Sequence, residues 1–389
     1  MVEMKSPGSR ISEFRLGAWR WLGGKWVMRI RAVPGCGCFR IFLACLYWFF
    51  FSCFLPGAWA WDYEGHKLIN QLALDSLPTN FPAFVFSAAA RERIAFLAGE
   101  PDRWRSSTEP TLRHANHVDH YFDIDLLSQY RLDPNALSPF RYEFMAQLAA
   151  AHSMRPGDFP VIDPAKDNDR NRALIGFLPW AITEYEAKLK VGFSYLKEYE
   201  QAGRAEDISN AQANIIYVMG VMGHFVGDGS QPLHSTRHHH GWVGANPEGY
   251  ATNYSIHSWI DGGYLQQFGV DRERLRARLR PARVLDLRHA GSSSTNLFAA
   301  VMSYLEEQHR LVEPLYRLEK AGKLSGRRPL AQDGHDFITG QILKASQALG
   351  DLWFTAWLQA PPDLALRSAL MKQKASGSST NSNGVESGK

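Results

Sequence analysis

Apolar residues after position 61 recur at spacings of three and four, which predicts amphipathic helices. The pattern covers eight segments: His66–Leu77, Phe84–Leu97, Tyr142–His152, Ile175–Tyr199, Ala211–Gly227, Ile256–Phe268, Leu297–Leu318 and Phe337–Leu358. Clear strand-like alternation occurs only at His120–Ile124, and loops are predicted at 156–169 and 238–253. We therefore expect an all-α fold, with one multi-helix domain over residues 61–373 and a disordered Ser-, Gly- and Asn-rich tail at 374–389.

The first sixty residues have the pattern of a secretory signal peptide. An apolar run at Ile41–Leu55 follows a basic stretch and precedes Ala-Trp-Ala at 58–60. Cleavage after Ala60 makes Trp61 the N-terminal residue of a secreted or periplasmic protein without stable membrane insertion. The run is shorter than the roughly 18 residues of a membrane span, so an uncleaved anchor is the less favoured alternative. The long basic stretch also allows translation to start at Met28.

Charge and cysteine are concentrated in the same segment. Of the 43 Lys and Arg residues, eight lie before residue 61, together with two of the 39 Asp and Glu residues, so the rest of the chain carries a net charge of −2. This balance excludes a broad basic surface for nucleic acid in the main body. All four cysteines also precede residue 61, which excludes disulfides and thiolate metal sites from the remainder.

Histidine and aspartate recur at helical spacing in two places. His224 precedes Asp228 by four residues, His257 precedes Asp261 by four, and His234 lies between the pairs. Imidazole nitrogen and carboxylate oxygen are the zinc ligands that remain when thiolates are absent. One such pair is as well explained by histidines that bond to carbonyls and aspartates that cap helices. Two pairs with a histidine between them favour a metal site.

Further candidates lie upstream. Asp102 precedes Arg105 by three residues, which is typical either of a metal ligand oriented by an arginine or of an exposed ion pair at a helix end. His114, His117 and His120 follow at intervals of three, and their spacing does not choose among them. If cleavage frees Trp61, its α-amine and its carbonyl oxygen can chelate a metal, which an internal tryptophan cannot do.

Together these residues resemble the trinuclear zinc phosphoesterases, which include S1-type single-strand nucleases, plant bifunctional nucleases and bacterial zinc-dependent phospholipases C. The resemblance runs from residue 61 to 261. It is carried by Trp61 with His66, DRWR at 102–105, HYFD at 120–123, GHFVGDGSQPLH at 223–234 and IHSWID at 256–261. It implies a single domain of the phospholipase C and zinc nuclease type, whose helices surround a buried trinuclear metal site.

The resemblance implies three zinc ions and their ligands. The first ion would be held by Asp102, His120, His224 and Asp228, and the second by His234, His257 and Asp261. The third would be held by the amine and carbonyl of Trp61, by His66 and by a bridging Asp228. Asp102, Arg105 and Asp228 are the implied catalytic residues. HYFD selects His120, so His114 and His117 are treated as structural and His238–His240 as a solvated loop near the site.

The chain departs from the family pattern between His120 and His224, where residues 126–217 contain an insertion. Within it, GFLPWAI at 176–182 is similar to a segment of bacterial phospholipase-like relatives. Trp259 lies two residues before Asp261, where the nucleases have it directly before. The cysteines that form disulfides in fungal and plant members are missing.

The resemblance implies phosphodiester hydrolysis, and the nuclease interpretation is favoured. Asp261 stands where phospholipases C have glutamate, and His234 and His257 are separated by 23 positions, as in the nucleases. The expected substrate is single-stranded DNA or RNA, or nucleotides, and the products would be 5′-phosphorylated. Bases would stack on aromatic side chains, with Tyr121, Trp242 and Tyr254 as candidates.

Two alternatives remain open. A phospholipid head group is the alternative substrate, which the insertion and GFLPWAI favour. A protein of another class would be non-catalytic and secreted, and its zinc would stabilise a helical fold that lacks disulfides.

Overall fold

The computed structural model describes residues 19–22, 25–28, 61–287 and 296–381. The chain divides into residues 1–57 and a larger unit from residue 58 onward. In the first unit, β1 (Trp19–Leu22) and β2 (Lys25–Met28) form an antiparallel hairpin. The apolar run at 41–55 and Ala60, on which the signal-peptide prediction rests, lie outside the described residues. Within those residues, no helix combines the length and hydropathy needed to cross a bilayer.

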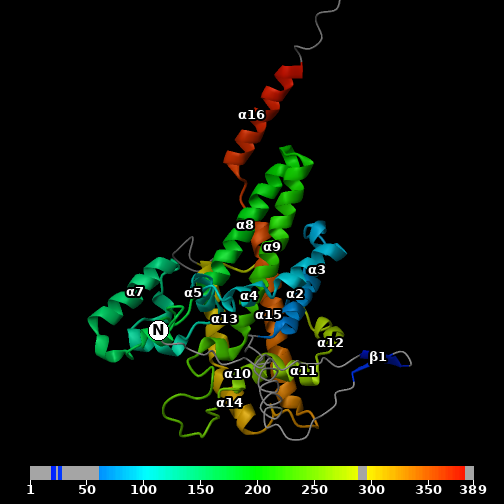
Figure 1. The fold of residues 1–389 in the computed structure, drawn as a ribbon. Helices are drawn as coiled ribbons and strands as arrows, with labels where there is room; N and C mark the ends of the chain where they lie inside the picture. The colour runs from blue at the N-terminus through cyan, green and yellow to red at the C-terminus, as the bar shows by residue number, and fades with distance from the viewer. Residues whose placement is uncertain (1–18, 23–24, 29–60, 288–295, 382–389) are drawn as a thin grey trace, which may run out of the picture. The chain divides into compact units, whose positions relative to one another are not determined.

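The larger unit is built from helices, as the periodicity predicts (Figure 1). They are α2 (Tyr63–Ser76), α3 (Ala88–Leu97), α4 (Glu100–Arg105), α5 (Pro110–His117), α6 (Leu127–Tyr130), α7 (Arg141–Met154), α8 (Leu178–Ala202), α9 (Ala205–Ser230), α10 (Ile256–Ser258), α11 (Tyr264–Phe268), α12 (Arg272–Arg276), α13 (Asn296–His309), α14 (Val312–Lys320), α15 (Gln332–Gln359) and α16 (Leu364–Asn381). Short 3₁₀ turns connect several of them, and Trp259–Gly263 forms a π-helical turn between α10 and α11.

The structure differs from the predicted elements at several places. The segment expected to form one helix at 297–318 is divided into α13 and α14, because Pro314 is tolerated in the first turn of α14 but would break a helix interior. The strand candidate at 120–124 forms no ladder and makes a single bridge from Phe122 to Gly176. Helix α16 continues to Asn381 and so overlaps the tail that composition predicts to be disordered.

The core forms where four helices meet. α8 packs along α9, α2 packs along α15, and α15 also contacts both α8 and α9 (Figure 1). Large side chains such as Trp180, Phe193, Phe225 and Trp353 are fully buried between them. The last turns of α9, residues 219–230, are buried on every side. Any polar group on this part of α9 therefore needs a partner inside the protein.

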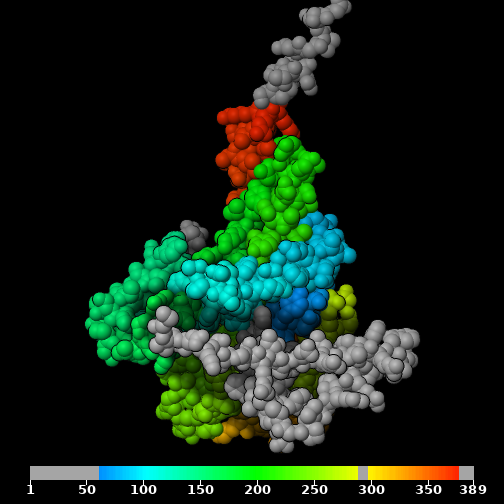
Figure 2. Space-filling model, in the orientation of Figure 1, coloured from blue at the N-terminus to red at the C-terminus, as the bar shows by residue number. Residues whose placement is uncertain are grey.

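Helices α3 to α5 cover one side of α9. α3 and α4 both contact α9, and α4 contacts α5. In the space-filling view these segments form a continuous cyan band across the front of the helical unit (Figure 2). The band shields from solvent the side chains that α4 and the following 3₁₀ turn direct inward, among them Asp102 and His120.

Asn70 on α2 links three of these helices through hydrogen bonds. Its Nδ2 donates to the carbonyl oxygens of Ile94 on α3 and Gly220 on α9, at 2.8 and 3.0 Å. The amide fits because Gly223 has no side chain, since a β-carbon there would lie 1.7 Å from Asn70 Oδ1. Glycine at 223 is thus required by close packing of α2 on α9.

We expect Gly223→Ala to lower the free energy of unfolding by about 1–3 kcal/mol, because the added methyl group displaces the Asn70 amide. Urea unfolding followed by circular dichroism measures the change. Gly340→Ala on α15 is the matched control, because a β-carbon there has no neighbour within 4 Å and should stabilise the helix by about 0.5–1 kcal/mol. Equal stability of the two variants would contradict the packing argument.

Candidate metal centre

The last turns of α9 carry two of the predicted ligands on one face. His224 and Asp228 are fully buried, and Asp228 Oδ2 lies 3.2 Å from His224 Nε2. An ionised carboxylate that has lost its hydration in this way requires compensating neighbours.

Helix α2 brings His66 against the same turn. Its ring stacks on that of His224 with centroids 3.9 Å apart, and its Nε2 lies 3.4 Å from Asp228 Oδ1. A β-carbon at Gly227 would lie 2.7 Å from His66 Nδ1, so the approach of His66 to α9 requires glycine there. His66, His224 and Asp228 form a group that could hold a metal ion.

A second group shares His224 and adds residues from two other segments. Asp102 lies in the first turn of α4, and His120 ends the 3₁₀ turn Val118–His120. His120 Nδ1 lies 2.9 Å from His224 Nε2, and Asp102 Oδ1 lies 3.8–3.9 Å from both nitrogens. Arg105 Nε donates to Asp102 Oδ1 at 2.6 Å, the orienting contact expected of this pair. Asp102, His120 and His224 could also hold an ion.

Asp228 connects these groups, because each of its oxygens faces a different set of imidazoles. Oδ2 lies 2.9 Å from His120 Nδ1 and 3.2 Å from His224 Nε2. Oδ1 lies 3.4 Å from His66 Nε2 and 3.7 Å from His234 Nδ1. The carboxylate therefore has the geometry of a bridge between neighbouring sites.

The third group comprises His234, His257 and Asp261. The Nε2 atoms of the two histidines are 3.0 Å apart, and Asp261 Oδ2 lies 2.8 Å from His257 Nε2. Asp261 belongs to the π-helical turn, a rare conformation that is frequent at functional sites. Trp259, whose spacing departs from the nuclease pattern, begins this turn and donates its indole N–H to the Leu324 carbonyl at 2.6 Å.

Backbone carbonyls set the protonation of two of these imidazoles. His224 Nδ1 lies 2.7 Å from the Ala98 carbonyl oxygen, and His234 Nδ1 lies 2.6 Å from that of His120. A carbonyl only accepts, so each Nδ1 carries a proton and each ring directs Nε2 at the cluster, where its lone pair becomes available once the ring is neutral. This is how outer partners orient metal-binding histidines.

Several buried atoms of the cluster find no hydrogen-bond partner among the described residues: His66 Nδ1 and Nε2, Asp102 Oδ2, His120 Nε2, Asp228 Oδ1, His257 Nδ1 and Asp261 Oδ2. Buried polar atoms are rarely left unpaired, because the loss of hydration is costly. Ligand atoms 2.0–2.1 Å from one tetrahedral zinc stand about 3.3 Å apart. The nitrogen and oxygen atoms here are separated by similar distances, so the donor set fits metal ions.

The electrostatics of the cluster favour ionised carboxylates. Burial alone would raise the pKa of Asp228, but the imidazoles of His224 and His234 outweigh it and hold the pKa well below its usual value. The pKa of Asp261 is lowered in the same way against burial, chiefly by His257. Burial, with Arg105 nearby, lowers the pKa of His120 to about 3. Anionic carboxylates and a neutral imidazole are the forms that bind cations.

Trp61 lies beside the ligand-bearing turn of α9. Its side chain is fully buried, and its indole N–H donates to the Gly227 carbonyl at 3.0 Å and to Ser230 Oγ at 3.1 Å. The next residue, Asp62, donates its backbone N–H to the Asp261 carbonyl at 2.9 Å. The start of the predicted mature chain is thus anchored between two elements that carry candidate ligands.

The remaining upstream histidines lie outside the three groups. His114 Nδ1 lies 2.8 Å from the Asp169 carbonyl oxygen, and His117 Nδ1 lies 3.6 Å from the Asp169 carboxylate. They connect α5 to the loop at 156–169, which agrees with a structural role.

The loop at 238–253, which was expected to be solvated, lies close to the cluster. The rings of His239 and His240 lie 5.9 and 5.1 Å from that of His257, and His240 stacks on Tyr254 at 3.8 Å. Tyr254 is 69% exposed. Among the predicted stacking residues it is the most open, because Tyr121 and Trp242 are partly buried.

The region 126–217, which contains the insertion, packs in the core next to the segment that carries His120. It comprises α6, α7, α8 and the first half of α9. The GFLPWAI segment begins α8, and its side chains Phe177, Leu178 and Trp180 are buried in the core. Its Gly176 forms the bridge to Phe122, within the HYFD motif. The segment therefore positions His120 rather than forming an exposed apolar surface.

Gln231 is a site residue that the sequence analysis missed. Its Nε2 donates to Asp261 Oδ1, and its Oε1 accepts from the backbone N–H of Leu233. The residue therefore fixes both the carboxylate and the turn that carries His234. Its position within GHFVGDGSQPLH was the feature that could have indicated it. The carboxylate that it contacts lies 30 positions away, so residue spacing could not predict the contact.

No family model, curated protein or solved structure shows significant similarity to this chain.

Adding ZnCl₂ to chelator-treated protein near neutral pH should release protons. Burial alone would lower the pKa of His234, but Asp228 and Asp261 outweigh it and raise the pKa to about 9, so a proton must leave before the ring binds an ion. Binding should weaken as the pH falls. Calorimetric titration in buffers of different ionisation enthalpy measures the release.

The His234→Ala variant should release about one proton fewer. His114→Ala, which removes a histidine outside the cluster, should release as many protons as the unmodified protein. Zinc uptake without proton release would contradict the assignment of His234.

Proposed function

We propose that this protein is a secreted zinc-dependent phosphodiesterase of the trinuclear zinc phosphoesterase type, which hydrolyses single-stranded nucleic acid to 5′-phosphorylated products. The observation that carries the proposal is that two buried His and Asp groups share His224, while Asp228 in one of them also lies 3.7 Å from His234 of the third group. Isolated structural zinc sites do not require a carboxylate that faces two sets of imidazoles.

Zinc is the metal that the donor set favours. The groups offer five imidazoles and three carboxylates, and every cysteine lies before residue 61. Imidazole suits zinc, whereas magnesium and calcium prefer sites built from oxygen alone. We assign one ion to Asp102, His120, His224 and Asp228, and a second to His234, His257 and Asp261.

A third ion would be held by His66, Asp228 and the mature N-terminus. Within the described residues, the side chains of this group are His66, His224 and Asp228. The amine and carbonyl oxygen of a processed Trp61 would add the remaining ligands. The buried indole of Trp61 anchors that residue next to Gly227, one position before Asp228.

When bound, zinc lowers the pKa of a water molecule to about 7 and neutralises charge on a phosphodiester. The chain's own residues hold and orient the charged groups. Arg105 fixes Asp102 through a 2.6 Å hydrogen bond, and the carbonyls of Ala98 and His120 fix the rings of His224 and His234. Gln231 fixes Asp261.

The accessible edge of the cluster favours a nucleic-acid substrate. His257 has a side chain that is 12% exposed, whereas His66, His224 and Asp228 are fully buried. Beside His257, the exposed ring of Tyr254 stacks on His240. Single-stranded nucleic acids bind by stacking bases on aromatic rings of this kind. The GFLPWAI segment, which favoured a lipid substrate, is buried and offers no lipid contact.

The mature protein should release 5′-nucleotides from single-stranded DNA or RNA, and a chelator should abolish the release. His224→Ala should lower the rate by more than about 100-fold, because it removes a ligand shared by two groups. Arg105→Ala should lower it by about 10–100-fold, since Asp102 loses its orienting partner. Chromatography of the products provides the measurement, and His114→Ala is the matched control.

A phosphatidylcholine analogue should be assayed in parallel. Cleavage of the lipid alone would replace the nuclease proposal with the phospholipase alternative. A protein that retains zinc but cleaves neither substrate would support the non-catalytic alternative.

Extending the mature chain by one residue tests the N-terminal ligand. A protein that begins with Ala60 should bind two zinc ions where one that begins with Trp61 binds three, because the α-amine becomes a peptide nitrogen. Elemental analysis measures the zinc content, and hydrolysis should fall with it. Equal zinc content in both proteins would remove Trp61 from the ligand set.

A further inference from the structure

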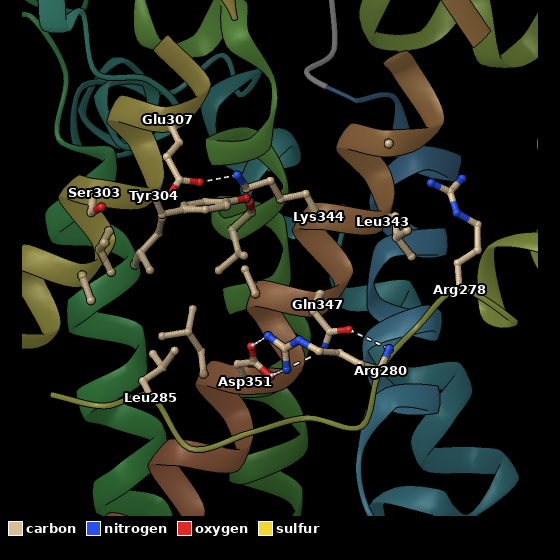
Figure 3. A pocket seen from close by; sticks show the side chains of 17 residues that line it. Arg278, Arg280, Leu285, Ser303, Tyr304, Glu307, Leu343, Lys344, Gln347 and Asp351 are labelled. Carbon is tan, nitrogen blue, oxygen red and sulfur yellow. Dashed lines mark hydrogen bonds and ion pairs between the residues drawn. The ribbon is translucent and has the colours of Figure 1, made fainter. Parts of the chain in front are cut away.

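A cavity of about 690 Å³ lies on the side of α9 opposite the metal cluster. It lies between α13, α15 and the segment 278–285 and opens to solvent (Figure 3). Val226 of α9 lines it, and this residue lies two positions from both His224 and Asp228, so it faces away from them. No candidate metal ligand lines the cavity, which is therefore a separate site.

The cavity has the size and the walls of a small-molecule site. Its volume falls within the range of about 300–1,000 Å³ that is typical of such pockets. Much of its wall is apolar: Ile182, Val226, Leu285, Val301, Leu343 and Leu352. Two ion pairs flank these walls, Glu307 with Lys344 and Arg280 with Asp351 (Figure 3). Within each pair the charges compensate each other.

The edge of the cavity carries uncompensated positive charge. Arg278 lines it and is exposed, and within the described part of the chain its guanidinium has no hydrogen-bond or ion-pair partner. It belongs to a strongly basic stretch, in which six arginines and a single glutamate occur between residues 272 and 283. An apolar cavity beside an unpaired guanidinium is complementary to an apolar chain that ends in an anion.

We infer that this cavity binds a single-chain amphiphile with an anionic head group, either a carboxylate or a phosphate. The hydrocarbon chain lies against Val226 and Val301, and the head group pairs with Arg278. The inference is independent of the proposed hydrolysis, because the site shares no residue with the metal cluster.

The first test is a titration of the full mature protein with the fluorescent fatty acid cis-parinarate. Saturable binding is expected, and it should persist in chelator. Dodecanoate and dodecyl phosphate should displace the probe, and their relative strength identifies the preferred head group. Dodecyltrimethylammonium has the same chain and the opposite charge, so it should displace the probe poorly. Equal displacement by the cation, or no saturable binding, would overturn the inference.

Gly340 offers a way to fill the cavity without disturbing the fold. It lines the cavity on α15, and an added β-carbon there meets no atom within 4 Å. Gly340→Trp should abolish probe binding, whereas the matched control Gly340→Ala should bind normally. Melting temperatures at or above that of the unmodified protein would show that both variants fold. Unchanged binding by a folded Gly340→Trp variant would place the ligand elsewhere.

Arg278→Ala should weaken dodecanoate binding by about fivefold, the upper range for an exposed ion pair. Arg327→Ala removes another exposed arginine that does not line the cavity, and it should leave binding unchanged. Equal effects of the two substitutions would show that general charge, rather than Arg278, attracts the anion.

Discussion

The buried carboxylate of Asp228 is the constraint on which the centre of the molecule depends. It lies on a helix turn that is shielded on every side, and it faces imidazoles contributed by four separate segments. Such a group is costly to bury unless charge or hydrogen bonds compensate for its lost hydration. The packing of α2, the 3₁₀ turn at His120 and the turn at His234 around α9 all provide that compensation.

Helix α9 accordingly has two opposed faces with different chemistry. On one face, His224 and Asp228 meet the polar cluster. On the other, Val226 lines an apolar cavity, and the hydroxyl of Tyr304 donates to the Val226 carbonyl at 2.9 Å. Because residues 219–230 of this helix are buried on both faces, the cluster and the cavity wall are both packed inside the protein.

Periodicity predicted the long helices well, because their apolar faces are buried in the way that the pattern assumes. The periodic pattern gave a wrong prediction where another constraint outweighed it. Pro314 divided one predicted helix into α13 and α14, and His120–Ile124 formed a single bridge, to Gly176, where alternation predicted a strand. Short helices such as α4 and α5 have too few turns to show a periodic pattern, so they were not predicted.

The sequence by itself determined the helical class and the pairs His224–Asp228 and His257–Asp261, because residues four apart on a helix must share a face. Only the tertiary structure decided that these pairs converge with His66, Asp102 and His120, since residue spacing within one helix says nothing about the distance to a remote segment. The same holds for Gln231 and for the cavity behind α9, which depend on how helices pack rather than on their order.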